Sequence, residues 1–120
     1  MASLESFRDG FRRRAKRLWE ERERLRQHTL ASVACALREI GRRHAATVLR
    51  FFVFGSLTRP GWFTSRSDID IAGEWRERGD YFGLWREIEE ALGREVDFRE
   101  LGEDSFSERV RQHGVVVYDA

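Results

Sequence analysis

The sequence has one cysteine, one proline, one lysine among its basic residues and no long apolar run. The single Cys35 excludes a disulfide within the chain, and its place on an apolar helical stripe predicts a buried thiol. No run approaches the roughly 18 apolar residues of a membrane-spanning helix, and the N-terminus lacks the apolar core of a secretory signal. With 120 residues, the chain is predicted to be a cytoplasmic protein with one modest core and no membrane association.

Charge is distributed unevenly along the chain. Residues 1–50 carry 13 basic and 6 acidic side chains, a balance of +7, whereas residues 51–120 carry 9 basic and 15 acidic side chains, a balance of −6. A basic first segment of this kind docks on an acidic partner, on the acidic half of its own chain or on nucleic acid, or it is a solvated helix face. We favour docking or solvation over direct nucleic-acid binding.

The first third of the chain has the apolar periodicity of a helix. Apolar residues recur at spacings of three, four and seven as far as Ile40, and the pattern weakens at residues 27–29, which predicts one or two helices. This helical part is longer than the remaining chain needs for its own core, so we expect it to contact another chain. The sequence is accordingly divided into a basic helical arm, residues 1–44, and a domain, residues 45–120.

After residue 47 the pattern changes to strands and short helices. We expect strands at 48–54, 68–72, 94–101 and 114–118. Asp80 and Asp104 are expected to cap two helices, the first of which ends at Gly93. The order of elements predicts an α+β (mixed α/β) fold, in which a small mixed sheet has flanking helices and a long N-terminal helix.

Three aspartates occupy the polar faces of the predicted strands. Asp68 and Asp70 are two residues apart and share one strand face, with Cα atoms about 6.6 Å apart. Two carboxylates on one face repel each other unless a cation lies between them. Asp97, on a later strand, is a third carboxylate for the same place. A set of carboxylates without histidine or cysteine suits Mg²⁺ or Mn²⁺, and a pair of such ions assists phosphoryl displacement.

A Gly-Ser turn directly follows the first predicted strand. Gly55 permits a tight turn and the close approach of a phosphate, and a helical turn that starts at Ser56 offers free amides and a hydroxyl to an anion. Arg59 and Arg66 lie in the connection to the first aspartate, where they are either solvated or in contact with a triphosphate. Each motif alone is common, whereas the ordered combination is specific.

This combination resembles the Gly-Ser…Asp-x-Asp signature of the DNA polymerase beta-like nucleotidyltransferase superfamily, and within it the minimal (MNT) nucleotidyltransferases of prokaryotes. The resemblance covers roughly residues 30–119, including the strand around Asp97 and the C-terminal residues 109–118. It implies a nucleotidyltransferase-type sheet. It also implies that Asp68 and Asp70 bind two Mg²⁺ ions.

The resemblance further implies that Asp97 completes one metal site and activates the acceptor hydroxyl, while Gly55 and Ser56 hold the triphosphate of ATP. Members of this family are often encoded beside a HEPN-domain RNase toxin as its antitoxin. The implied reaction is transfer of AMP from ATP to a hydroxyl of that toxin, in characterised pairs a tyrosine hydroxyl. Three alternatives stay open: a non-catalytic antitoxin that acts by occlusion, an aminoglycoside-type small-molecule nucleotidyltransferase, and a nucleic-acid-binding module.

Overall fold

The apolar, β-branched run that follows residue 47 forms one of the two central strands of a four-stranded sheet. The computed structural model describes residues 3–120. Its elements in chain order are α1 (Leu4–Arg43), β1 (Val48–Phe54), the short 3₁₀ helix η1 (Gly55–Thr58), β2 (Asp70–Trp75), α2 (Tyr81–Leu92), β3 (Asp97–Glu100), α3 (Ser105–His113) and β4 (Val115–Asp119).

The sheet is mixed and has the strand order β3-β2-β1-β4. β1 pairs antiparallel with β2 and with β4, whereas β2 and β3 are parallel. The helix α2 forms the crossover that a parallel pair requires, since it connects β2 to β3. The predicted α+β fold with a small mixed sheet, flanking helices and a long N-terminal helix is therefore confirmed.

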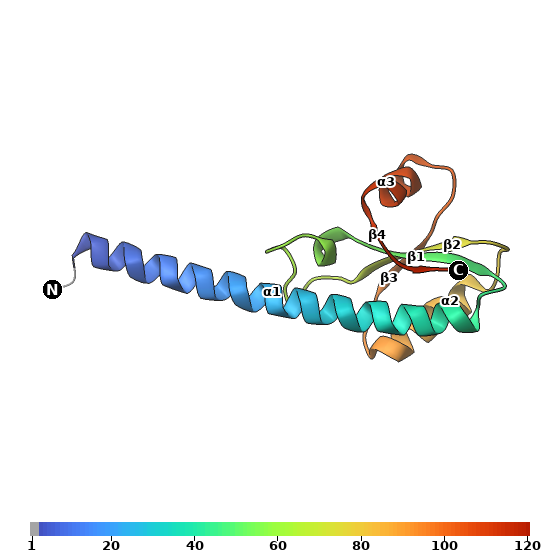
Figure 1. Cartoon of the computed structure of the whole chain (residues 1–120), viewed down its shortest axis with the longest axis horizontal. Coiled ribbons are helices and arrows are strands. Elements are labelled where there is room, and N and C mark those ends of the chain that lie inside the picture. Colours follow the sequence, from blue (N-terminus) through green and yellow to red (C-terminus); the bar gives the residue numbers. More distant parts are fainter. Residues whose placement is uncertain (1–2) are drawn as a thin grey trace.

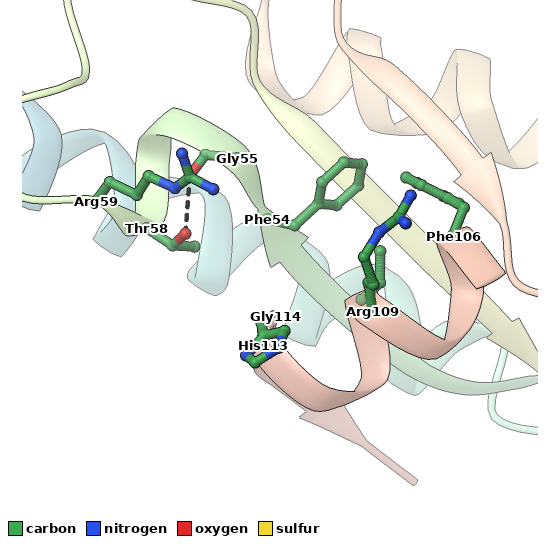
Figure 2. Close-up of a pocket in the computed structure, with 9 residues that line it drawn as sticks. Phe54, Gly55, Thr58, Arg59, Phe106, Arg109, His113 and Gly114 are labelled. Carbon is green, nitrogen blue, oxygen red and sulfur yellow. Dashed lines mark hydrogen bonds between the residues drawn. The ribbon is translucent and has the colours of Figure 1, made fainter.

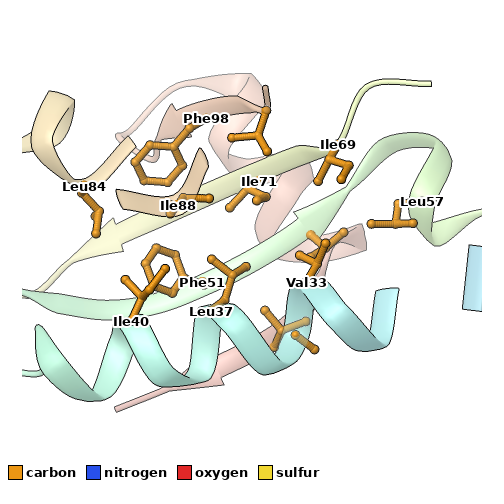
Figure 3. Close-up of a cluster of buried hydrophobic side chains, with 14 of the residues drawn as sticks. Val33, Leu37, Ile40, Phe51, Leu57, Ile69, Ile71, Leu84, Ile88 and Phe98 are labelled. Atoms are coloured by element: carbon orange, nitrogen blue, oxygen red, sulfur yellow. The ribbon is translucent and has the colours of Figure 1, made fainter. Parts of the chain in front are cut away.

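Helices cover both faces of the sheet (Figure 1). On one face the main core joins α1 and α2 to the strands through Leu37, Phe51 and Ile88, which are fully buried (Figure 3). On the other face α3 covers a smaller cluster that includes Phe52 and Val110. Coverage of both faces explains why β1 reads as a nearly continuous apolar run.

The N-terminal segment is one helix without interruption at residues 27–29. Ser3 caps its start by accepting a hydrogen bond from the amide of Ser6 at 3.1 Å. At 1.5 Å per residue, a helix of 40 residues is about 60 Å long, and the molecule accordingly measures 68 × 30 × 20 Å. Half of the helix projects beyond the sheet (Figure 1).

No helix in residues 3–120 combines the length and apolar character needed to cross a bilayer.

The boundary between arm and domain at residue 44 remains a prediction. The first two residues of the predicted arm, 1–44, lie outside the described residues. Within the described part, Val33, Leu37 and Ile40 at the C-terminal end of α1 are at most 1% exposed in the main core. This end of the helix is thus part of the packed body as well as a continuation of the arm.

Three local expectations differ from the structure. The strand expected at residues 68–72 runs from Asp70 to Trp75, because its partner β1 ends at Phe54, opposite Asp70. Asp68 therefore lies just ahead of the strand and does not share a strand face with Asp70. The predicted strand at residues 94–101 narrows to β3, because the amide of Val96 donates to the Glu89 side chain at 2.9 Å instead of to a neighbouring strand. Cys35 is exposed, not buried. It is one position past the residues that face the sheet, and each helical residue rotates by about 100°.

Candidate active site

The parallel pairing of β2 with β3 brings two of the predicted carboxylates together. Asp70 opens β2 and is the register partner of Asp97, which opens β3. The amide of Asp97 donates to the carbonyl oxygen of Ile69 at 2.9 Å, so the backbones are joined directly beside these side chains. Asp68 is exposed and lies two residues before Asp70, just ahead of the strand. All three aspartates therefore occupy one end of the sheet.

Side chains of α2 and of the following turn hold this end of β3 in place. Trp85 donates from Nε1 to the carbonyl oxygen of Val96 at 3.1 Å, next to Asp97. Arg94 donates to the carbonyl oxygen of Ser67 at 2.9 Å and so links the approach to β3 with the approach to β2. The positions of the acidic side chains thus depend on contacts between elements that are distant in sequence.

The environment of Asp70 shifts its ionisation. Burial, together with the negative charges of Asp97 and Asp68, raises its pKa to about 6, and the nearby Arg99 offsets only part of this effect. Asp97 has a counter-ion, because Arg99 donates from Nε to its carboxylate at 3.0 Å. The site therefore holds an excess of negative charge centred on Asp70.

The donor chemistry of this site fits a hard divalent cation. Within residues 3–120, no three acidic, histidine or cysteine side chains are gathered closely enough to enclose a metal ion by themselves. Mg²⁺ does not require such a cage, since it is commonly bound by one or two carboxylates together with substrate phosphates and water. The adjacent Asp70 and Asp97 provide these carboxylates, and the raised pKa of Asp70 reflects a charge that a cation would neutralise.

Gly55 packs directly against Asp70. Its φ of +74° lies in the left-handed region, and a Cβ at this position would collide with Oδ2 of Asp70. The helical turn η1 starts here, and the hydroxyl of Thr58 donates to the carbonyl oxygen of Gly55 at 2.8 Å. Ser56 is half-buried in this turn, and its carbonyl oxygen accepts from the amide of Arg59. The Gly-Ser turn and the aspartates thus form one continuous surface.

A pocket of about 280 Å³, lined in part by Gly55, lies between η1 and α3 (Figure 2). Its apolar wall includes Phe54 and Phe106, whose rings meet edge to face at 5.5 Å. Arg59 lines the pocket, whereas Arg66 in the following loop lies outside it, and both residues are exposed. Of the described residues, those that line the pocket include three basic side chains and no acidic one, which suits an anionic group.

The two other basic side chains of this pocket, Arg109 and His113, were not among the predicted site residues. They are four positions apart on α3, so they share one helical face. His113 is the last residue of α3. Their spacing was visible in the sequence, but the packing of α3 beside η1 was not.

Hydrogen bonds join the long helix α1 to the end of the sheet that carries the aspartates. The Glu23 carboxylate accepts from the amide of Gly61 at 2.6 Å and from Arg26 at 2.9 Å. Arg26 also donates to the carbonyl oxygen of Leu57 in η1 at 3.2 Å. Glu23 and Arg26 are therefore a fixed connection between the helix and the segment that leads from Gly55 to the aspartates.

Comparison with known proteins agrees with this arrangement. The family described as Polymerase beta, Nucleotidyltransferase matches residues 36–120. No curated protein matches the chain. A chain in the crystal structure of a mutant toxin-antitoxin pair, MntA-HpeT, is similar with a TM-score of 0.59 and 21% sequence identity, over 72% of this chain and 73% of that one. This similarity establishes a common fold, and the family match, which spans well over half of the sequence, establishes that the chain belongs to the polymerase beta nucleotidyltransferase family.

Proposed function

We propose that the chain is a metal-dependent nucleotidyltransferase that transfers AMP from ATP to a tyrosine hydroxyl of a partner HEPN-family RNase toxin, and that it thereby acts as the antitoxin. The observation that carries the enzymatic part is the contact of Gly55 with Asp70, which is itself the register partner of Asp97. In this arrangement a phosphate held at the Gly-Ser turn lies next to the carboxylates that are needed to hold its metal ions.

Asp68 and Asp70 are proposed to hold two Mg²⁺ ions, with Asp97 as a further ligand of one. When bound, the ions neutralise phosphate charge and polarise the reacting phosphoryl group. Mn²⁺ prefers the same oxygen ligands and is expected to substitute. ATP is thus the proposed substrate, and the divalent ions are the proposed cofactor.

The remaining roles follow from the positions of the side chains. Gly55, Ser56 and Arg59 are proposed to hold the β- and γ-phosphates, with Arg59 better placed than the exposed Arg66. Asp97 accepts the proton of the acceptor hydroxyl, whose oxygen then forms a bond to the α-phosphorus. The bond from this phosphorus to the bridging oxygen breaks, and pyrophosphate leaves. The protein contributes mainly positioning and charge neutralisation.

Two observations support a protein toxin as acceptor. The described residues form one sheet with its helices, and a partner that binds stably through its own fold would position the acceptor hydroxyl beside them. The similar solved structure is of a toxin-antitoxin pair, and its mutations replace two aspartates that are two positions apart by glutamate. Asp68 and Asp70 have the same spacing in this chain.

The test is transfer of label from α-phosphate-labelled ATP with Mg²⁺ into proteins of the source-cell lysate, beside γ-labelled ATP. We expect a protein band with the α-label only. Asp70→Asn should reduce the labelling by about 100-fold or more, since a metal ligand is lost. Asp119→Asn is the matched control, because Asp119 pairs with Arg50 toward the opposite end of β1. Near-full labelling by Asp70→Asn would contradict the mechanism.

The pairing of Asp97 with Arg99 favours a second candidate, a non-catalytic antitoxin that neutralises the toxin by occlusion. In this candidate the arginine occupies the carboxylate permanently, and the acidic site has no catalytic use. Neutralisation of the toxin that is equally complete with Asp68→Asn would favour occlusion, whereas loss of neutralisation in this variant would favour catalysis.

A further inference from the structure

The N-terminal part of α1, residues 4–18, is a helix without a partner in the rest of the described chain; we call it the free arm. Its large apolar side chains are exposed, with Leu4 and Phe7 at 64%, Phe11 at 61% and Leu18 at 48%. A single helix of this length has little stability of its own in water. Exposed apolar side chains at this density indicate a binding surface, because contact with water does not stabilise them.

These side chains form one stripe. Leu4, Phe11 and Leu18 are separated by seven residues each, and Phe7 falls between the first two at a spacing of three. In a helix of 3.6 residues per turn, such positions lie on the same face. The stripe has the pattern of a helix that packs lengthwise against another apolar surface.

The charges around the stripe indicate what that surface is. Helical geometry puts Arg8 and Arg14 on the two edges of the stripe. The acidic side chains of the free arm, Glu5 and Asp9, lie on the opposite face, together with Arg13 and Lys16. Two copies of the arm packed stripe to stripe would bring these arginines against each other, and like charges at such positions oppose pairing. A partner with acidic side chains along an apolar groove has the complementary charge.

The position of the free arm connects it to the reaction. α1 is fixed to the catalytic end of the sheet by the bonds from Glu23 to Gly61 and from Arg26 to Leu57. The free arm ends just before Glu23 in the sequence and projects from that same end of the molecule (Figure 1). A protein that binds the stripe therefore lies next to the end of the sheet where Asp70 and Asp97 meet.

We infer that the free arm is the docking surface for the protein acceptor, which presents an apolar groove or helix face bordered by acidic side chains. This inference rests on the proposed function and adds to it the element that recognises the acceptor. The catalytic residues select the nucleotide and the reaction, and the free arm selects the protein and holds its hydroxyl close to the site.

The test compares three double variants in the lysate assay with α-labelled ATP. Phe7→Ala with Phe11→Ala removes the centre of the stripe, and Arg8→Glu with Arg14→Glu reverses the charge of its edges. Arg13→Glu with Lys16→Glu is the control, because it makes the same change of charge on the opposite face of the helix. We expect at least a tenfold loss of acceptor labelling in the first two variants and wild-type labelling in the control. Binding of Mg²⁺ and ATP should be unchanged in all three.

Several results would overturn this inference. Unchanged labelling of the acceptor by Phe7→Ala with Phe11→Ala would exclude the free arm as the docking surface. Unchanged labelling by Arg8→Glu with Arg14→Glu would exclude an acidic partner. If the wild type sediments as a dimer that dissociates on Phe7→Ala with Phe11→Ala, the free arm binds a second copy of the chain instead. If RNase treatment abolishes the labelling, the free arm binds RNA instead. Absence of labelling by the wild type would instead overturn the proposed function, and this inference with it.

Discussion

At the scale of single residues, Gly55 and Asp70 are the closest link between the two halves of the candidate site. Gly55→Ala should destabilise the fold and abolish nucleotidyl transfer, because the new methyl group would push against the Asp70 carboxylate. Gly93→Ala is the matched control: its φ of +67° is also left-handed, but no atom lies within 4 Å of the added carbon. The control should lose about 1–2 kcal/mol of unfolding free energy and keep its activity. Denaturant unfolding and the labelling assay separate the two effects, and equal losses in both variants would contradict this prediction.

Asp70 also makes stability depend on pH. Its pKa is about 6 in the folded protein against an ordinary value of 3.8. As the pH rises between these values, the unfolded chain loses the proton first, so the folded state becomes less stable. Above pH 6 this penalty is complete, and below pH 3.8 it is absent.

Asp70→Asn should therefore have a higher Tm than the wild type at pH 8 in the presence of EDTA, and the difference should disappear as the pH falls toward 4. Mg²⁺ should raise the Tm of the wild type at pH 8 more than that of the variant, because it compensates the charge that the variant lacks. Thermal unfolding over this pH range tests both statements. A wild type that gains stability relative to the variant between pH 5 and pH 8 without metal would contradict them.

At the scale of elements, α1 has two parts with different energetic roles. Leu37 is fully buried against the sheet, whereas Leu18 is 48% exposed on the free arm. Leu37→Ala should cost about 2–5 kcal/mol of unfolding free energy, because it leaves a cavity in the main core. The same substitution at Leu18 should change stability by no more than about 0.5 kcal/mol. Chemical denaturation of both variants measures the difference, and similar losses would mean that the free arm folds back onto the body.

At the scale of the whole molecule, the elongated shape separates the body that carries the candidate site from the free arm. Deletion of residues 1–18 should leave a folded protein that binds Mg²⁺ and ATP but no longer labels its acceptor. Deletion of residues 1–44 should unfold the chain, since it removes Val33, Leu37 and Ile40 from the main core. Circular dichroism and nucleotide binding test both deletions. A folded fragment of residues 45–120 would instead show that the predicted domain is independent.

Short sequence patterns were sufficient to predict most of the helices and strands. The strand at residues 48–54 agrees with β1 because its β-branched and aromatic residues are continuous and end at a glycine. Asp80 and Asp104 cap α2 and α3 as expected, and Gly93 ends α2 in the left-handed conformation. These features depend on a few neighbouring residues, so the sequence determines them directly.

The sequence by itself also predicted the residues of the candidate site, since a Gly-Ser turn and three aspartates in a set order are readable without coordinates. Only the tertiary structure decided that Asp70 pairs in register with Asp97 and that Arg109 joins Arg59 around one pocket. It also decided which half of α1 is covered. Strand register and helix packing arise from contacts between residues far apart in the chain. The apolar pattern of one segment shows which of its faces is buried, but it does not show which other element covers that face.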